Sequence, residues 1–260
     1  MASAAMDYAK MPGHWLLASL GKTVLRPGGL EMTRKMLEQL NIQEHDTVVE
    51  FAPGLGVTAR IALQHNPKYY AVEQDAFAAA KVQKLLNSDR HQVINGTAEE
   101  TGLDSGIASI VYGEAMLTMQ SPVQKDRIIS EAKRILSIGG RYAIHEMSLK
   151  PDDIDLETRG EIRKDLVDAI KVNALPLTVP EWKALLESHG FEVEFVATTP
   201  MHLLRPKRLV EDEGVLGVLK IAKNVLTNPP ARARVLKMRS TFSKHSAYLQ
   251  GVCIVARRVK

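Results

Sequence analysis

Two glutamates and a glycine-rich turn form the pattern in this sequence that is best suited to bind a small molecule. Glu50 lies near the end of an apolar run, and the turn Ala52-Pro53-Gly54-Leu55-Gly56 follows at once. Glu73 ends the next apolar run along the chain. Glycines let a ligand approach the backbone, and a helix that begins after such a turn presents free N–H groups. The pattern therefore predicts a binding site for a nucleotide or a phosphate group.

The elements that must position these residues alternate between strand and helix. Apolar runs predict strands at residues 48–51, 69–73, 92–95, 107–112 and 141–147. Helices are predicted between them, for example over residues 122–136, with Gly139-Gly140 after it. Short alternating elements are typical of parallel crossover units in a doubly wound sheet. Ligands bind at the carboxyl ends of such strands, where Glu50, Glu73 and Glu146 are found.

Helical segments flank this alternating region. Apolar residues at helical spacing predict helices from His14 to Leu25 and from Leu30 to Leu40, before the first strand. A long insertion before the last strand predicts two more helices, at residues 207–226 and 231–245. We therefore expect one domain over residues 1–260. Its parts are a helical N-terminal extension at 1–45, a core at 46–199 and 249–260, and a helical insertion at 200–248.

The order of residues around the turn separates two kinds of nucleotide site. A dinucleotide-binding turn needs three glycines, the third of which packs helix on strand. Here small residues fall at alternate positions, Ala52, Gly54 and Gly56, after the acidic Glu50. This order resembles the first motif of class I S-adenosylmethionine-dependent methyltransferases, an acidic residue followed by G-x-G-x-G. Ala52 stands where that motif has its first glycine, so we expect ordinary backbone dihedrals at this position.

The resemblance covers roughly residues 46–200 and the last strand, and it implies a fold and a cofactor. The fold is a Rossmann-like α/β fold, with a doubly wound, mostly parallel sheet of seven strands and, in this chain, a helical cap. The cofactor is S-adenosylmethionine, with S-adenosylhomocysteine as product. By resemblance, Glu73 accepts hydrogen bonds from both ribose hydroxyls, Glu50 approaches the amino-acid end, and residues 96–99 border adenine. The implied cofactor set is Glu50, Ala52, Pro53, Gly54, Gly56, Glu73, Gln74, Gly96, Thr97, Ala98, Glu99 and Glu114.

The segment after the fourth predicted strand bears on the methyl acceptor. The glycine turn also resembles that of ribosomal-RNA adenine dimethyltransferases, which carry an Asn-Pro-Pro-aromatic motif after this strand. Here the segment is Val111-Tyr112-Gly113-Glu114-Ala115-Met116-Leu117, and it contains no such motif. The layout is instead similar to the methyltransferases of quinone and lipid biosynthesis. That similarity implies a small-molecule acceptor, and it leaves open whether O, N, S or C is methylated.

Two other functions stay open from the sequence. An RNA methyltransferase could use the cationic residues late in the chain. A solvated helix face also explains such a run, and the chain has few aromatic residues for stacking on bases. The second alternative is a nucleotide-binding protein that keeps the fold without catalysis.

Four residues are candidates to hold or deprotonate an acceptor, namely Glu146, His145, Glu114 and His14. His145 and Glu146 are neighbours in a predicted strand, so their side chains point to opposite faces of the sheet. Only one of the two can therefore face a given pocket wall. The position at the carboxyl end of the strand favours Glu146.

The composition of the chain limits which classes of protein it can belong to. Hydrophobic residues make up 45% of the 260 residues, enough for one sizeable core. We find no run of about 18 apolar residues that would span a membrane, and no signal peptide. Cys253 is the single cysteine, so we expect no disulfide and no metal site. We expect a cytoplasmic protein that acts on a small molecule, does not bind nucleic acid and could self-associate through its helical extensions.

Overall fold

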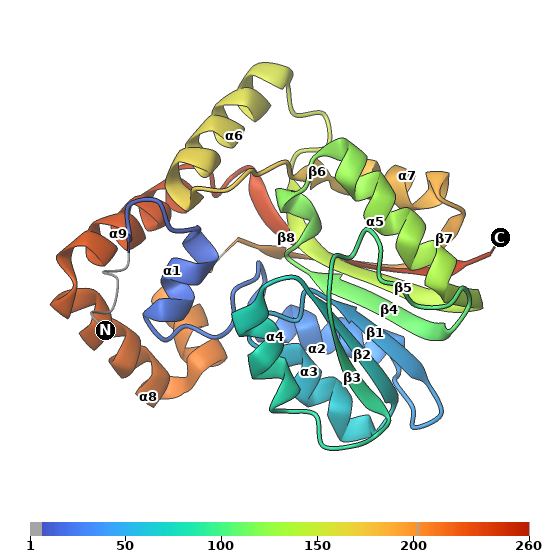
Figure 1. Cartoon of the computed structure of the whole chain (residues 1–260). Coiled ribbons are helices and arrows are strands. Elements are labelled where there is room, and N and C mark those ends of the chain that lie inside the picture. The colour runs from blue at the N-terminus through green and yellow to red at the C-terminus, as the bar shows by residue number, and fades with distance from the viewer. Residues whose placement is uncertain (1–6, 202, 260) are drawn as a thin grey trace.

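The computed structural model describes residues 7–201 and 203–259 (Figure 1). Its centre is a sheet with the strand order β3-β2-β1-β4-β5-β8-β7. The strands are β1 (Thr47–Phe51), β2 (Lys68–Glu73), β3 (His91–Asn95), β4 (Ala108–Glu114), β5 (Leu136–Leu149), β6 (Leu177–Thr178), β7 (Phe191–Pro200) and β8 (Leu249–Arg258). The α-helices are α1 (Gly13–Ser19), α2 (Gly29–Leu40), α3 (Val57–Ala62), α4 (Ala76–Gln83), α5 (Pro122–Ile135), α6 (Leu156–Ile170), α7 (Val179–Ser188), α8 (Pro206–Thr227) and α9 (Pro229–Lys244).

The order and direction of the strands confirm the predicted fold class. β1 to β5 run parallel, and β8 lies antiparallel between β5 and β7. The two-residue strand β6 pairs with the end of β5 and adds an eighth strand to the seven expected. The chain moves outward from β1 in both directions, so the order reverses between β1 and β4. Ligands bind at such a switch point in doubly wound sheets.

Helices cover both faces of the sheet because its strands alternate side chains between two buried cores. Val49 and Ile144 belong to the core on one face, together with Trp182 of α7 and residues of α5. Val48 and Ile110 belong to the core on the other face, with residues of α2, α3 and α4. Glu50 lies on this second face, level with Tyr112 of β4.

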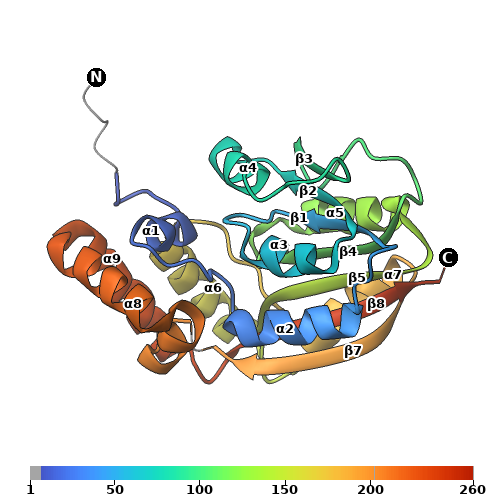
Figure 2. The ribbon, with the colours of Figure 1, turned by 90° about the horizontal axis from the view of Figure 1, so that it is seen from below.

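A helical cap made of α1, α6, α8 and α9 stands at the carboxyl ends of the strands (Figures 1 and 2). It has its own apolar core, in which Leu16, Leu166 and Met238 pack with Met147 and Leu249 from the strand ends. α8 and α9 form the outer layer, on the far side of α1 from the sheet. Within residues 7–201 and 203–259, no helix is long and apolar enough to cross a membrane.

Three elements, β5, α1 and α8, depart from the prediction for local reasons. β5 begins at Leu136 and continues through Gly139 and Gly140, where the sequence predicts a helix end and a turn, because Leu136 pairs with β4. α1 ends at Ser19 rather than near Leu25. Gly21 follows with a φ of 102°, and the Lys22 N–H turns back to the Leu17 carbonyl. α8 is interrupted at Gly214, whose φ of 68° and ψ of 169° are not helical.

Candidate active site

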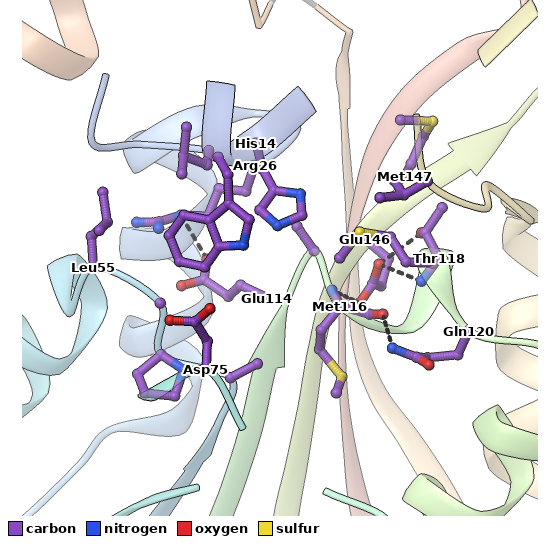
Figure 3. Close-up of a pocket in the computed structure, with 18 of the residues that line it drawn as sticks. His14, Arg26, Leu55, Asp75, Glu114, Met116, Thr118, Gln120, Glu146 and Met147 are labelled. Atoms are coloured by element: carbon purple, nitrogen blue, oxygen red, sulfur yellow. Dashed lines mark hydrogen bonds and ion pairs between the residues drawn. The ribbon is translucent and has the colours of Figure 1, made fainter. Parts of the chain in front are cut away.

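A cavity of about 540 Å³ opens at the carboxyl ends of β1, β2 and β4, beneath the helical cap (Figure 3). Every residue of the implied cofactor set except Gly56 lines it. His14, Arg26 and Asp75 line it as well, and so does Glu146. The tertiary fold therefore gathers one face of the glycine turn, the strand ends and the first helix around a single volume.

Glu73 and the glycine turn are joined by a direct hydrogen bond. The Gly54 N–H donates to one carboxylate oxygen of Glu73 (3.0 Å), and the Asp75 N–H donates to the other (2.9 Å). Burial raises the pKa of Glu73, although these N–H groups oppose the shift. Asp75 also forms the N-cap of α4 by accepting from the Ala78 N–H (2.9 Å), as the sequence predicts. The Glu73 carboxylate is thus held rigidly at the cavity wall.

The prediction of ordinary backbone dihedrals at Ala52, the first small residue of the turn, is wrong. Its φ is 51°, in the left-handed region, and its N–H donates to the Val72 carbonyl (2.8 Å). This bond to β2 fixes the turn in a conformation that costs an L-residue about 1–2 kcal/mol. Ala115, at the end of β4, has a φ of 53° and lines the same cavity. Strained alanines thus stand at the tips of two adjacent central strands.

Gly56 does not line the cavity, contrary to the expectation that a ligand touches its backbone. Its φ is 73°, and a Cβ at this position would lie 2.5 Å from the Leu85 side chain. The glycine is therefore required by its backbone conformation and by the packing of the turn against the segment after α4. Gly54 has a φ of 55°, and a Cβ there would meet no side chain within 4 Å.

The segment Gly96-Thr97-Ala98-Glu99 forms another wall of the cavity. The Glu99 carboxylate accepts from Gln124 Nε2 (3.3 Å) and lies 3.5 Å from Arg127 Nη1, both on α5. These two contacts orient the Glu99 carboxylate, and Gln124 lines the cavity as well. Its proposed position near an adenine amine stays a prediction.

Glu50 has two tyrosine partners in the buried side of the cavity wall. One of its oxygens accepts hydrogen bonds from the hydroxyls of Tyr69 and Tyr112 (2.8 Å for Tyr112). Burial raises the pKa of Glu50 to about 7, because desolvation outweighs the two hydroxyl donors. The Glu50 carboxyl can therefore exist in both protonation states near neutral pH.

The raised pKa of Glu50 makes the stability of the protein depend on pH. The unfolded carboxyl titrates near 4.5 and the folded one near 7. The folded state therefore binds the proton more tightly, and stability falls as the pH rises between these values. The variant Glu50→Gln keeps the acceptor for the tyrosines and removes the titration. Its stability relative to wild type should increase by about 2.5 kcal/mol from pH 5 to pH 8. Urea unfolding at both pH values measures this difference, and a constant difference would contradict the assignment.

A buried polar network lies behind Glu50 and is built around Glu114. Its carboxylate accepts from Thr33 (2.6 Å) and Thr58, lies 3.0 Å from Arg26 Nε, and lies 2.6 Å from His145 Nδ1. Burial alone would raise the pKa of Glu114. The charge of Arg26 and the hydrogen bond from His145 outweigh it and lower the pKa to about 2. Glu114 is therefore ionised and saturated, which is unsuited to a general base.

Adjacent residues of β5 serve opposite faces of the sheet, as their alternation predicts. Glu146 lines the cavity and accepts from the N–H groups of Met116, Leu117 and Thr118 (2.7–3.0 Å) and from the Thr118 hydroxyl (2.7 Å). Burial raises the pKa of Glu146, and these donors oppose the rise. His145 lies on the other face, fully buried, with Nε2 against the Pro27 carbonyl. Glu146 thus fixes the loop after β4, and His145 has no access to the cavity.

His14 is the remaining candidate for proton transfer. It lies on α1, lines the cavity and is only partly buried (Figure 3). Burial lowers the pKa of His14 below its usual value, although the charge of Asp75 opposes the shift. A neutral imidazole at a cavity wall can accept a proton or a hydrogen bond.

No protein-family model matches this chain. A protein of Haemophilus influenzae, described as uncharacterized, is 32% identical over 248 residues, which cover 93% of this chain and 96% of that protein. The chain belongs to the family of that protein. A second relative is described as a probable ribosomal RNA small subunit methyltransferase A of Thermococcus kodakarensis. It is 26% identical over 148 residues, 54% of this chain and 51% of that protein.

Solved structures of known enzymes superpose on most of the chain. Phosphoethanolamine N-methyltransferase 2 of Haemonchus contortus matches with a TM-score of 0.70 and 14% identity, over 95% of this chain and 57% of that one. Geranyl diphosphate methyltransferase in complex with SAM matches with a TM-score of 0.64 and 16% identity, over 88% and 85%. The chain has the class I methyltransferase fold. The [4+2]-cyclase SpnF matches equally well, with a TM-score of 0.69, 15% identity and coverage of 94% and 92%.

Arg26 is a site residue that the sequence does not reveal. Arg26 belongs to the connection between α1 and α2, where the sequence Arg26-Pro27-Gly28-Gly29 signals only the end of a helix. Its partner Glu114 comes from β4, far along the chain. A basic residue in this connection becomes a site candidate only when the fold places it over the end of β4.

Proposed function

We propose that this protein is an S-adenosylmethionine-dependent methyltransferase that acts on a small-molecule acceptor. The observation that carries the proposal is the arrangement at the cavity, where Glu73, the Gly54 backbone and Arg26 line one volume at the switch point of the sheet. The class I methyltransferase fold supports it, although the cyclase among the structural neighbours shows that this fold serves more than one reaction.

The residues present fit the three parts of this cofactor. Glu73 would accept hydrogen bonds from the ribose hydroxyls, beside the open backbone of Gly54. Thr97 and Ala98 would border the adenine. Arg26 lines the cavity, and its Nη2 is buried with no hydrogen-bond partner among the described residues. An orphaned guanidinium nitrogen needs an acceptor, and the carboxylate of the cofactor's amino-acid part would supply one.

The cofactor, when bound, supplies a methyl group on a positively charged sulfur. The chain's contribution is to orient the acceptor and exclude water from it. The part of the cavity formed by the helical cap is apolar, with Met147, Ile170, Met201, Met238 and Phe242 in its wall. This wall suits an acceptor with a sizeable apolar part.

His14 would hold or deprotonate the acceptor. The lowered pKa of its ring can be measured directly. In an NMR titration of the histidine ring protons, the His14 signal should show a midpoint below the usual 6.5, because its burial disfavours the charged ring. Loss of that signal in His14→Gln assigns it. Asp75→Asn should lower the midpoint further, since the Asp75 charge raises the pKa. A midpoint at or above 6.5 would contradict the lowered pKa of His14.

Calorimetric titration with S-adenosylmethionine and S-adenosylhomocysteine tests the proposed function. We expect dissociation constants in the micromolar range or below. A screen of candidate acceptors with cofactor labelled at the methyl group then identifies the acceptor class. Absence of binding at millimolar concentrations of either compound would overturn the proposal. Binding without transfer to any acceptor would instead favour the non-catalytic alternative.

RNA is the second candidate acceptor, favoured by the partial similarity to the Thermococcus protein. The segment after β4, Glu114-Ala115-Met116-Leu117, lacks the Asn-Pro-Pro-aromatic motif of adenine dimethyltransferases. Tight RNA binding that weakens steeply with salt in a gel-shift titration would support this acceptor. Weak binding that does not depend on salt would remove it.

A further inference from the structure

The half of α8 that follows Gly214 carries an apolar stripe on its outer side. Val215, Leu216, Leu219 and Leu226 expose 64%, 83%, 61% and 66% of their surface. Positions 215, 219 and 226 fall on one side of a helix, with Leu216 beside them. Monomeric proteins seldom expose several large apolar side chains in one patch unless the patch binds something.

The opposite side of this half-helix packs against the rest of the helical cap. Ile221 is buried, Val225 packs against the core of the cap, and Asn224 Nδ2 donates to the Leu20 carbonyl after α1 (3.0 Å). The helix therefore has a defined orientation. Its leucines face outward because the inner face is already taken, in the outer layer that Figures 1 and 2 show.

The charge of this surface has one sign. Residues 214–260 contain no aspartate or glutamate. Lys220, Lys223 and Arg232 are exposed, and none has a carboxylate partner among the residues that the structure describes. The cations of α9 that face α6 are different, because Lys237 pairs with Asp168 and Lys244 with Glu161 and Asp165.

All three acidic residues of α8 lie before the break at Gly214. Glu211 is exposed and pairs with Arg208 of the same helix, whereas Asp212 and Glu213 point inward. Asp212 accepts from the Leu30 N–H (2.9 Å). Glu213 accepts from the N–H groups of Thr23 and Val24 (2.8 and 2.9 Å) and pairs with Lys22 (3.4 Å). The carboxylates of Asp212 and Glu213 thus hold the connection between α1 and α2 in place. What remains on the outer side after Gly214 is leucine, valine and lysine.

We propose that the half of α8 after Gly214 docks on the surface of anionic phospholipid bilayers. The exposed leucines would enter the boundary between headgroups and acyl chains, while Lys220 and Lys223 contact lipid phosphates. A second copy of this chain fits less well, because matching surfaces would bring unpaired cations together. Nucleic acid also fits less well, because its phosphate backbone has no apolar surface for the exposed leucines to contact. This inference does not depend on the reaction that the cavity catalyses.

Co-sedimentation with lipid vesicles tests the proposal with the full chain. Wild-type protein should sediment with vesicles of phosphatidylcholine mixed with phosphatidylglycerol and only weakly with phosphatidylcholine alone. The double variant Leu216→Gln/Leu219→Gln should lower the partition coefficient at least about tenfold. The double variant Lys220→Gln/Lys223→Gln should lower it about tenfold and reduce its dependence on salt. Leu156→Gln is the matched control, because Leu156 is equally exposed at the start of α6 and should leave binding unchanged.

Three results would overturn the proposal. The first is wild-type protein that ignores the anionic vesicles. The second is a leucine double variant that binds them as wild type does. The third is a dimer in light scattering that the leucine double variant converts to a monomer, since the stripe would then serve a second copy. Thermal unfolding by circular dichroism and cofactor titration verify that each variant is folded.

Discussion

Replacing Glu73 by alanine is expected to raise the dissociation constant for S-adenosylmethionine about 100-fold or more. In the proposed function, the Glu73 carboxylate, which the Gly54 and Asp75 N–H groups hold in place, would accept hydrogen bonds from both hydroxyls of the ribose. Hydrogen bonds to a charged acceptor contribute about 1.5 kcal/mol or more each, and every 1.4 kcal/mol is a factor of ten in affinity. Isothermal titration of wild type and variant measures the ratio directly.

Two further variants separate this effect from a general disturbance of the site. Glu100→Ala removes an exposed glutamate beside the predicted adenine segment and should bind the cofactor as wild type does. Glu73→Gln keeps an oxygen acceptor but loses the charge, so its affinity should lie between those of wild type and Glu73→Ala. An unchanged affinity in Glu73→Ala would refute the ribose assignment, provided that circular dichroism shows the same fold.

Replacing Arg26 by methionine should both destabilise the protein and weaken cofactor binding. Arg26 is buried, and its Nε lies 3.0 Å from the buried Glu114 carboxylate. Removing one partner of such a pair leaves an uncompensated buried charge and costs about 3–5 kcal/mol. The orphaned Nη2, which we assign to the cofactor's carboxylate, disappears as well. Urea unfolding and cofactor titration measure the two losses separately.

The double variant Arg26→Met/Glu114→Gln distinguishes the structural role of Arg26 from its binding role. Neutralising Glu114 removes the uncompensated charge, so much of the lost stability should return. Cofactor affinity should stay low, because the amide of residue 114 offers no cation to a carboxylate. If affinity returned together with stability, Arg26 would serve only the fold, and the proposed carboxylate contact would be wrong.

The local parts of the fold follow from the sequence because they depend on neighbours in the chain. The strand ends at Phe51 and Glu73, the glycine turn after the first strand and the capping residue Asp75 are each encoded within a few residues. The alternation of these units is enough to predict the doubly wound sheet. Even the opposite orientations of His145 and Glu146 follow from the period of a strand.

What the sequence did not show depends on contacts between distant segments. The backbone bond from Ala52 to Val72 fixes the left-handed turn, whatever conformation alanine itself prefers. Gly56 is a packing residue only because the segment after α4 lies against it.

The catalytic candidates were reordered for the same reason. From chemical type and position in the chain, His14, Glu114, His145 and Glu146 were all candidates, and Glu146 was favoured over His145. The fold saturates Glu114 and Glu146 with hydrogen bonds and buries His145 on the other face of the sheet. It leaves His14 at the cavity and brings Arg26 there from a connection without a recognisable motif. Sequence alone determined the doubly wound sheet and the cofactor-binding turn at the carboxyl ends of its strands. Tertiary structure decided which side chains are free to act, because hydrogen-bond saturation and burial are set by partners from other elements.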